Sequence, residues 1–180
     1  MKSVLISIRP QGAEKIVSGE KTIEVRKSAP QEVPFKAYIY ETQGRTETPW
    51  VDEDGHFIYK GRGQVIGEFI CDKVERLEEH IEQGGLYYIL SDTFNEQAQL
   101  DNWELHDYGK GKPLYGWHIS NLTLYDKPKE LSEFCIPCRV SCENCKNPLY
   151  FECWCEEKGK KIVTRPPQSW CYVEDLGEEE

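Results

Sequence analysis

The sequence lacks a long apolar segment, an internal repeat and a low-complexity stretch. No run of about 18 apolar residues occurs in its 180 residues, so we expect no membrane-spanning helix. The first residues, MKSVLISIRPQG, hold too short an apolar core for a signal peptide. The mean hydropathy of -0.66 also argues against a protein that lives in lipid. We therefore expect a cytoplasmic protein.

The sequence also lacks an excess of positive charge. Its 22 lysines and arginines face 32 aspartates and glutamates, which gives a formal net charge of -10. Binding to nucleic acid by charge alone is thus not expected, because phosphate neutralisation needs clustered lysine and arginine. Residues 1–30 are an exception, since they hold six basic and three acidic residues. An anionic ligand is expected near this N-terminal part, whereas residues 175–180 are predicted to form an acidic, disordered tail.

Cysteine is abundant, and six of the eight cysteines fall within residues 135–155. In a reducing cytosol such a cluster indicates a metal site, because thiolates bind zinc in a tetrahedron. An all-thiolate set leaves no open position, so the zinc is predicted to be structural. The spacing favours Cys138, Cys142 and Cys145 together with Cys153 or Cys155, with Cys135 spare. The alternative is a set of unliganded thiols in a flexible insert.

Hydrophobic patterning predicts an α+β fold. We expect helices over residues 11–18 and 101–108, a hairpin or long loop around residues 56–59, and a short helix within residues 126–134. Strands are expected over residues 4–8, 22–26, 35–40, 64–74, 114–120 and 170–173. A sheet of this size with short helices predicts a small curled barrel. Residues 1–174 would form a single domain, with residues 135–155 as a zinc-stapled insert.

One predicted strand carries three charged residues close together. In the segment Ser18 to Lys27, SGEKTIEVRK, the side chains of Glu24 and Arg26 fall on one face of the strand and the apolar residues on the other. Lys21 lies at the turn, from which its flexible ammonium could reach over that face. The three groups suit a ligand with anionic groups and base edges. The alternative is a solvated strand face with a weak ion pair.

The charged segment resembles the G-x-K-x-x-E-x-R signature of the ASCH domain, a branch of the PUA-like superfamily. Gly19, Lys21, Glu24 and Arg26 occupy its positions. The strand that ends at Arg9, the segment YGWHIS at 115–120 and the segment PPQSWCYV at 166–173 are similar to the same bacterial and phage group. The resemblance implies a small β-barrel with flanking helices and a cleft for RNA or a modified nucleotide.

The predicted cleft is lined by charged residues of the motif and by residues from two later strands. The candidate ligand-binding residues are Arg9, Lys21, Glu24, Arg26, His118 and Ser120, with Glu68 as a further candidate. Trp117 is either a core residue or a platform on which a base stacks. RNA or a nucleotide-like molecule is the expected partner, and the oligomeric state stays open.

An enzymatic function is the main alternative. Some small ASCH-like proteins are amidohydrolases of acetylated cytidine that use a lysine, a threonine and a later glutamate. Lys21 and Glu68 match two of these residues, but Glu24 stands where the threonine is expected. Lys21, Glu24 and Glu68 are therefore the catalytic candidates if the chain is a hydrolase of nucleosides or RNA. A third possibility is a protein-interaction adaptor that uses the zinc insert and the acidic tail.

Overall fold

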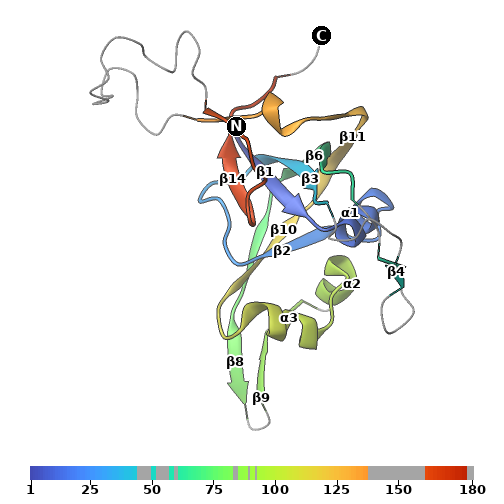
Figure 1. The fold of residues 1–180 in the computed structure, drawn as a ribbon. Helices are drawn as coiled ribbons and strands as arrows, with labels where there is room; N and C mark the ends of the chain where they lie inside the picture. The colour runs from blue at the N-terminus through green and yellow to red at the C-terminus, as the bar shows by residue number, and fades with distance from the viewer. Residues whose placement is uncertain are drawn as a thin grey trace.

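The computed structural model describes residues 1–43, 50–51, 57–58, 61–82, 85–88, 90–91, 93–137 and 161–177. Its largest sheet has five strands and lies at the centre of the view in Figure 1. The strand order is β11 (Ser120–Lys129), β6 (Gln64–Cys71), β3 (Phe35–Glu41), β1 (Lys2–Ile8) and β14 (Trp170–Val173). β1 and β3 pair in parallel, and the other pairs are antiparallel.

The two faces of this sheet are covered differently. Phe35, Ala37 and Ile39 of β3 belong to a core that includes Ile16 of helix α1 (Pro10–Val17). Tyr38, the residue between Ala37 and Ile39, belongs to a separate core on the other face. Pro10 opens α1, where its missing N–H costs no hydrogen bond. Helix α1 thus defines one face of the sheet, which we call the α1 face.

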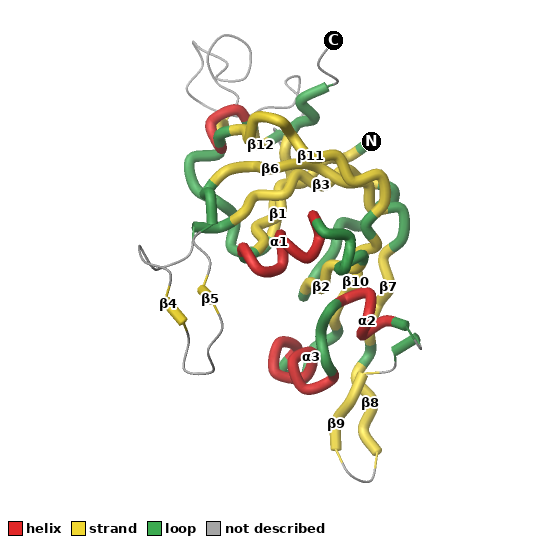
Figure 2. The backbone as a smooth tube through the Cα atoms, turned by 90° about the vertical axis from the view of Figure 1, so that its right-hand side faces the viewer, coloured by secondary structure: helices red, strands yellow, loops and turns green. Residues whose placement is uncertain are grey.

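A three-stranded sheet carries the charged motif. Its order is β2 (Ile23–Arg26), β10 (Leu114–His118) and β7 (Val74–Leu77). Ile23 and Val25 pack with buried side chains of α2 (Phe94–Ala98) and α3 (Asn102–Gly109). Figure 2 shows both helices beside this sheet and α1 in front of the larger one. The helices leave the opposite face of β2, with Glu24 and Arg26, turned toward the larger sheet.

Short elements complete the described structure. Three two-stranded antiparallel sheets pair β4 (Trp50–Val51) with β5 (Phe57–Ile58), β8 (Glu79–Glu82) with β9 (Gly85–Tyr88), and β12 (Cys135–Ile136) with β13 (Lys161–Ile162). A 3-10 helix, η1, spans Leu131–Glu133. The antiparallel pairing of β4 with β5 agrees with the hairpin alternative for residues 56–59, of which only residues 57–58 are described. The β8–β9 pair and α2 were not predicted.

The α+β class is confirmed, and the closed barrel is not. The described strands form two separate main sheets, because the chain breaks where long strands were expected. The strand predicted over residues 64–74 ends at Cys71 and resumes as β7, and the strand over residues 114–120 is interrupted at Ile119. Each break moves the chain from one sheet to the other. The strands over residues 35–40 and 170–173 and the helix over residues 101–108 are confirmed within one residue at each end.

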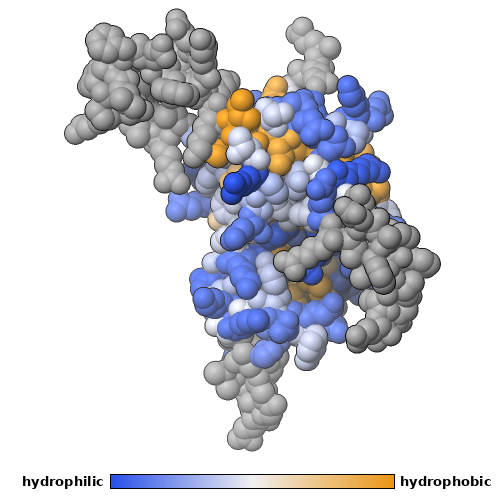
Figure 3. Space-filling model, viewed as in Figure 1, coloured by the Kyte–Doolittle hydropathy of each residue, from blue (hydrophilic) through white to orange (hydrophobic). Residues whose placement is uncertain are grey.

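The first residues of the predicted C-terminal tail contact the large sheet. The Asp175 carboxylate accepts a hydrogen bond of 2.6 Å from the Tyr38 hydroxyl, and the Leu176 N–H donates to that hydroxyl at 3.0 Å. These contacts place Asp175 and Leu176 against Tyr38 of β3, and residues 178–180 of the predicted tail lie outside the described part. Among the described helices, none is both long and apolar enough to cross a membrane. Figure 3 shows a mostly hydrophilic face, with hydrophobic residues gathered toward the end that carries the N-terminus.

Candidate functional site

The charged motif is held in place by the turn between α1 and β2. Gly19 has a φ of 80°, a conformation that favours glycine, and it turns the chain after α1. The Lys21 N–H donates to the Lys15 carbonyl at 2.9 Å, and the Thr22 N–H donates to the Gln97 carbonyl at 2.8 Å. These backbone bonds fix Lys21 between α1 and α2 at the start of β2.

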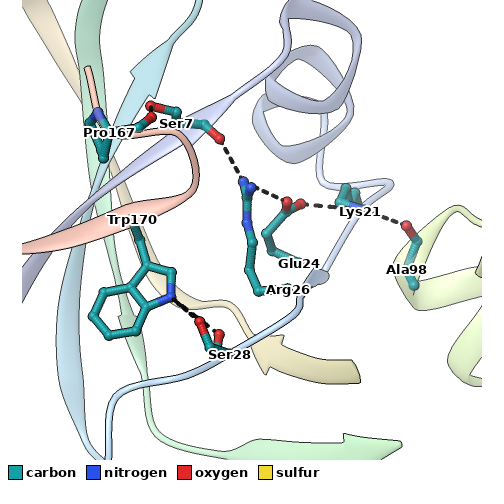
Figure 4. Close-up of polar contacts among 8 residues, drawn as sticks. All are labelled: Ser7, Lys21, Glu24, Arg26, Ser28, Ala98, Pro167 and Trp170. Carbon is teal, nitrogen blue, oxygen red and sulfur yellow. Dashed lines mark hydrogen bonds and ion pairs between the residues drawn. The ribbon is translucent and has the colours of Figure 1, made fainter. Parts of the chain in front are cut away.

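The three charged side chains of the motif converge, as the strand pattern predicts. We call Lys21, Glu24 and Arg26 the motif cluster. The Glu24 carboxylate lies 3.4 Å from Lys21 Nζ and 2.9 Å from Arg26 Nη2. Figure 4 shows the carboxylate between the two cations. A carboxylate bridging two cations leaves the cluster with a formal charge of +1.

Backbone carbonyls at both ends complete the motif cluster. Arg26 Nη2 donates to the Ser7 carbonyl at 2.7 Å, and Lys21 Nζ donates to the Ala98 carbonyl at 2.5 Å (Figure 4). Ser7 belongs to β1 of the larger sheet, and Ala98 ends α2. The motif cluster therefore connects the two main sheets and α2.

The motif cluster is buried but not fully saturated. Its residues are only 6% (Lys21), 7% (Glu24) and 8% (Arg26) exposed. Arg26 Nε is buried and has no hydrogen-bond partner in the described part of the chain, and the same holds for Trp117 Nε1. Trp117 lies directly opposite Glu24 in the β10–β2 pairing, so both orphan donors belong to one face of the small sheet. Buried donors of this kind are rare and call for an acceptor.

Trp117 is a core residue in this structure. It is 0% exposed and packs edge to face against Phe35 and Trp170, with ring centroids 5.0 and 5.7 Å apart. The platform interpretation requires an accessible ring face, which this side chain lacks. Of the two alternatives for Trp117, the core assignment agrees with the structure.

His118 and Ser120 do not join the motif cluster. His118 pairs with Ile23 across the β10–β2 ladder, on the face opposite to Glu24, and its Nε2 lies 3.4 Å from Glu75 Oε2. The Ser120 hydroxyl donates to the Ile70 carbonyl at 2.8 Å and so completes the β11–β6 pairing. Arg9 is exposed at the N-terminus of α1. Trp117 and His118 thus lie on opposite faces of the small sheet, because successive residues of a strand point to opposite sides.

Glu68 lies apart from Lys21, which corrects the predicted catalytic set. It pairs with Tyr38 across the β6–β3 ladder and points to the face opposite to α1. There its Oε1 lies 3.2 Å from Lys36 Nζ, and its Oε2 accepts a hydrogen bond of 2.5 Å from the Tyr125 hydroxyl. The three catalytic candidates Lys21, Glu24 and Glu68 are therefore not assembled in one place.

The predicted zinc ligands Cys138, Cys142, Cys145, Cys153 and Cys155 lie outside the described residues. Within the described ranges, no three histidine, cysteine, aspartate or glutamate side chains are placed so that they could hold a metal ion. Burial raises the pKa of the Cys71 thiol to about 12 and also raises that of Cys171. At neutral pH both thiols are therefore in the protonated form, which disfavours them as nucleophiles.

Two contributors to the motif cluster were not predicted. The carbonyls of Ser7 and Ala98 are backbone atoms, so no residue type in the sequence marks them. For a second charged cluster the sequence does contain a signal. Lys36 is the lone charged residue in the apolar run FKAYIY of the predicted strand 35–40, and a buried charge needs a partner. Its partners, Glu68 and Asp175, are 32 and 139 positions away and could not be paired with it from the sequence.

No protein-family model matches the sequence, and neither does any curated protein. Solved structures do match the fold. A crystal structure of ASCH from Zymomonas mobilis aligns with 96% of this chain and 88% of its own, with 19% identity and a TM-score of 0.52. A tyrosine-to-phenylalanine variant of that protein aligns with 97% of this chain and 91% of its own, with 18% identity and a TM-score of 0.50. The chain therefore has the fold of an ASCH domain, as its motifs predict.

Proposed function

We propose that this ASCH-fold chain binds RNA or a nucleotide-like molecule at the motif cluster. The observation that carries the proposal is the Arg26 guanidinium, whose Nε has no partner among the described residues although the side chain is buried. Arginine binds phosphate with two parallel N–H donors. In Arg26 the Nη2 atom already serves Glu24 and Ser7, whereas Nε is a buried donor that a ligand oxygen could satisfy.

The charge of the motif cluster supports the same ligand class. The cluster is formally +1 within a chain of net charge -10, so its charge is opposite in sign to that of the chain as a whole. Charge-assisted hydrogen bonds are about twice as strong as neutral ones. A phosphate or a base carbonyl would complete the Arg26 donor set, and Glu24 would keep the guanidinium plane in place.

The test is a binding titration with a panel of nucleosides, nucleotides and short single-stranded RNAs. Wild type is compared with Lys21→Ala and with Arg26→Lys, which keeps the charge but loses the planar donor set. Lys110→Ala serves as a matched control. Lys110 is exposed at the end of α3, so this substitution removes one cation at a position away from the cluster. Unfolding curves of each variant establish that it is folded.

We expect at least one ligand to bind wild type and Lys110→Ala equally, and to bind both cluster variants about tenfold more weakly or worse, as for loss of a charge-assisted hydrogen bond. Equal binding in all four proteins, or none in any, contradicts the proposal. The same incubations, extended to acetylated cytidine and labelled RNA, are analysed for products. A product that depends on Lys21 would place the chain among hydrolases instead.

We also propose that the segment 135–155 binds a structural zinc ion through cysteine thiolates. The proposal rests on the spacing of the cysteines in the sequence. Protein purified without chelator should contain close to one zinc per chain by mass spectrometry of the metal. Replacing both Cys142 and Cys145 by serine should abolish that content, whereas Cys71→Ser should leave it unchanged. Metal-free wild type would overturn the proposal.

A further inference from the structure

The described structure contains a cavity of about 600 Å3 that is separate from the motif cluster. It lies over β6 and β11, and its walls also include the end of the C-terminal segment. Figure 2 places these strands at the upper edge of the large sheet, above α1. Its polar lining includes Lys36, Glu68, Thr123, Tyr125, Lys129 and Asp175. A volume of this size is typical of small-molecule sites.

A compact charged cluster forms the base of this cavity. Lys36 Nζ lies 3.2 Å from Glu68 Oε1 and 3.2 Å from Asp175 Oδ1. We call these three residues the Lys36 cluster. Lys36 is only 8% exposed, whereas the side chains of Glu68 and Asp175 are 23% and 38% exposed. The ammonium is thus enclosed, and the two carboxylates present their remaining surface to the cavity.

Hydrogen bonds from two tyrosines fix these carboxylates. The Tyr38 hydroxyl donates to Asp175 Oδ1 at 2.6 Å, and the Tyr125 hydroxyl donates to Glu68 Oε2 at 2.5 Å. Both acids are therefore held in defined positions before any ligand arrives. Preorganised polar groups bind a ligand with little ordering cost.

The shape of β11 opens the cavity. The β11–β6 register shifts twice, between Ser120 and Thr123 and between Leu124 and Lys129. Asn121, beside the first shift, has a φ of 47°. Gly67 of β6 lets the bent strand approach, since a Cβ there would lie 2.4 Å from the Thr123 carbonyl oxygen. Irregular pairing of this kind occurs often beside binding sites, where it redirects side chains.

The charges of the cavity are arranged in two parts of opposite sign. The Lys36 cluster, with two carboxylates and one ammonium, is formally -1. On the other side of the Tyr125 ring stands the Lys129 ammonium, 5.2 Å from the ring centroid. One tyrosine side chain thus contacts a carboxylate with its hydroxyl and an ammonium with its ring face.

We propose that this cavity binds a small zwitterion of the amino-acid type. The ligand's protonated amine would be accepted by Glu68 and Asp175, and its carboxylate would lie toward Lys129. The lining holds two lysines and two carboxylates, so its charged side chains match a ligand that carries both signs of charge better than a simple polyanion. The proposal does not rest on nucleotide binding at the motif cluster.

The test is titration of the full chain with free amino acids, followed by nuclear magnetic resonance and calorimetry. Methylamine and acetate serve as singly charged probes, and cytidine as a neutral one. Glu68→Gln removes one carboxylate with little change in shape, and Lys129→Met removes the opposing ammonium. Lys127→Met is the matched control, because Lys127 is an exposed residue of the same strand and does not line the cavity.

We expect at least one amino acid to bind wild type and Lys127→Met alike, and to bind Glu68→Gln and Lys129→Met about tenfold more weakly, as expected for loss of one charged partner. Methylamine, acetate and cytidine should bind far more weakly than the zwitterion. Lys21→Ala should retain amino-acid binding, which separates this result from the nucleotide titrations. The proposal is overturned if no amino acid binds, if a singly charged probe binds equally well, or if neither cavity variant weakens binding.

Discussion

The two charged clusters of this fold are built in opposite ways. In the motif cluster one carboxylate stands between two cations, whereas in the Lys36 cluster one ammonium stands between two carboxylates. Their exposure differs as well. The side chains of Lys21, Glu24 and Arg26 are 7 to 10% exposed, but the two acids of the Lys36 cluster are 23% and 38% exposed. Burial, more than the number of ion pairs, should therefore decide what each cluster contributes.

The clusters also differ in what they connect. The outer hydrogen bonds of the motif cluster go to backbone carbonyls of β1 and α2. The cluster therefore connects the large sheet to the helix that packs on the small sheet. The Lys36 cluster attaches the C-terminal segment to β3 through the side chain of Asp175, which contacts Lys36 and Tyr38. The first is thus part of the packing between the two sheets, and the second holds one wall of a cavity. Four experiments test this difference, beginning with the largest expected effect.

Glu24→Ala should destabilise the protein most. It leaves the Lys21 and Arg26 cations buried side by side without their shared carboxylate, and breaking a buried ion pair in this way costs about 3–5 kcal/mol. The free energy of unfolding is measured by urea denaturation. Glu24→Gln, which keeps the shape and one hydrogen-bond acceptor, should lose less. A loss below about 1 kcal/mol, the value for an exposed ion pair, would contradict the assignment of this cluster as buried packing.

The motif cluster is the part of the site that the sequence could predict. Lys21, Glu24 and Arg26 lie within six positions, and the alternation of one strand is enough to place Glu24 and Arg26 on one face. Their burial could not be predicted, since it depends on β1 and α2, which pack over them. The same limit explains Glu68, which has the expected residue type in the expected strand but faces the opposite side of the large sheet.

Lys36→Met should cost less, about 1–3 kcal/mol, the usual penalty for leaving polar groups without a partner. The two carboxylates that remain can recover hydration from the cavity. Adding Asp175→Asn to Lys36→Met removes one of the repelling charges and should restore part of the loss. Urea denaturation of the single and double variants measures this coupling. If Lys36→Met is as destabilising as Glu24→Ala, the carboxylates of the Lys36 cluster are as inaccessible to water as the charged groups of the motif cluster.

Acidification should release the C-terminal segment. Burial raises the pKa of Asp175, but hydrogen bonds from Tyr38 and Lys36 outweigh it and leave the pKa below its ordinary value of 3.8. A lowered folded-state pKa adds stability that is present above pH 3.8 and lost as the pH falls further. The stability difference between wild type and Asp175→Asn, measured in urea, should thus be constant near neutrality and shrink below pH 3.8. A difference that persists unchanged at pH 2 to 3 would show that the carboxylate charge does not hold the segment.

The fold was predictable where the pattern is local and not where chain breaks decide the topology. Phe35 to Tyr40 is a continuous apolar run around Lys36, and it is a strand as predicted. Residues 64–74 have the same strand character, yet the chain leaves the large sheet after Cys71, because β7 pairs with β10 instead. Strand propensity does not reveal such a change of partner. The predicted barrel therefore becomes two open sheets.

Tyr125→Phe should have the smallest effect and is the most sensitive probe of the cavity. It removes the hydroxyl that donates to Glu68 but keeps the ring that faces Lys129. Because Glu68 is 23% exposed, water can take the place of the hydroxyl, and the loss should stay at or below about 1 kcal/mol. Urea denaturation measures it, with Tyr115→Phe as the control. A penalty of about 3 kcal/mol, as for a buried charged acceptor left unpaired, would mean that water does not reach this carboxylate. In that case the two clusters would be alike in burial and would differ only in the sign of their charge.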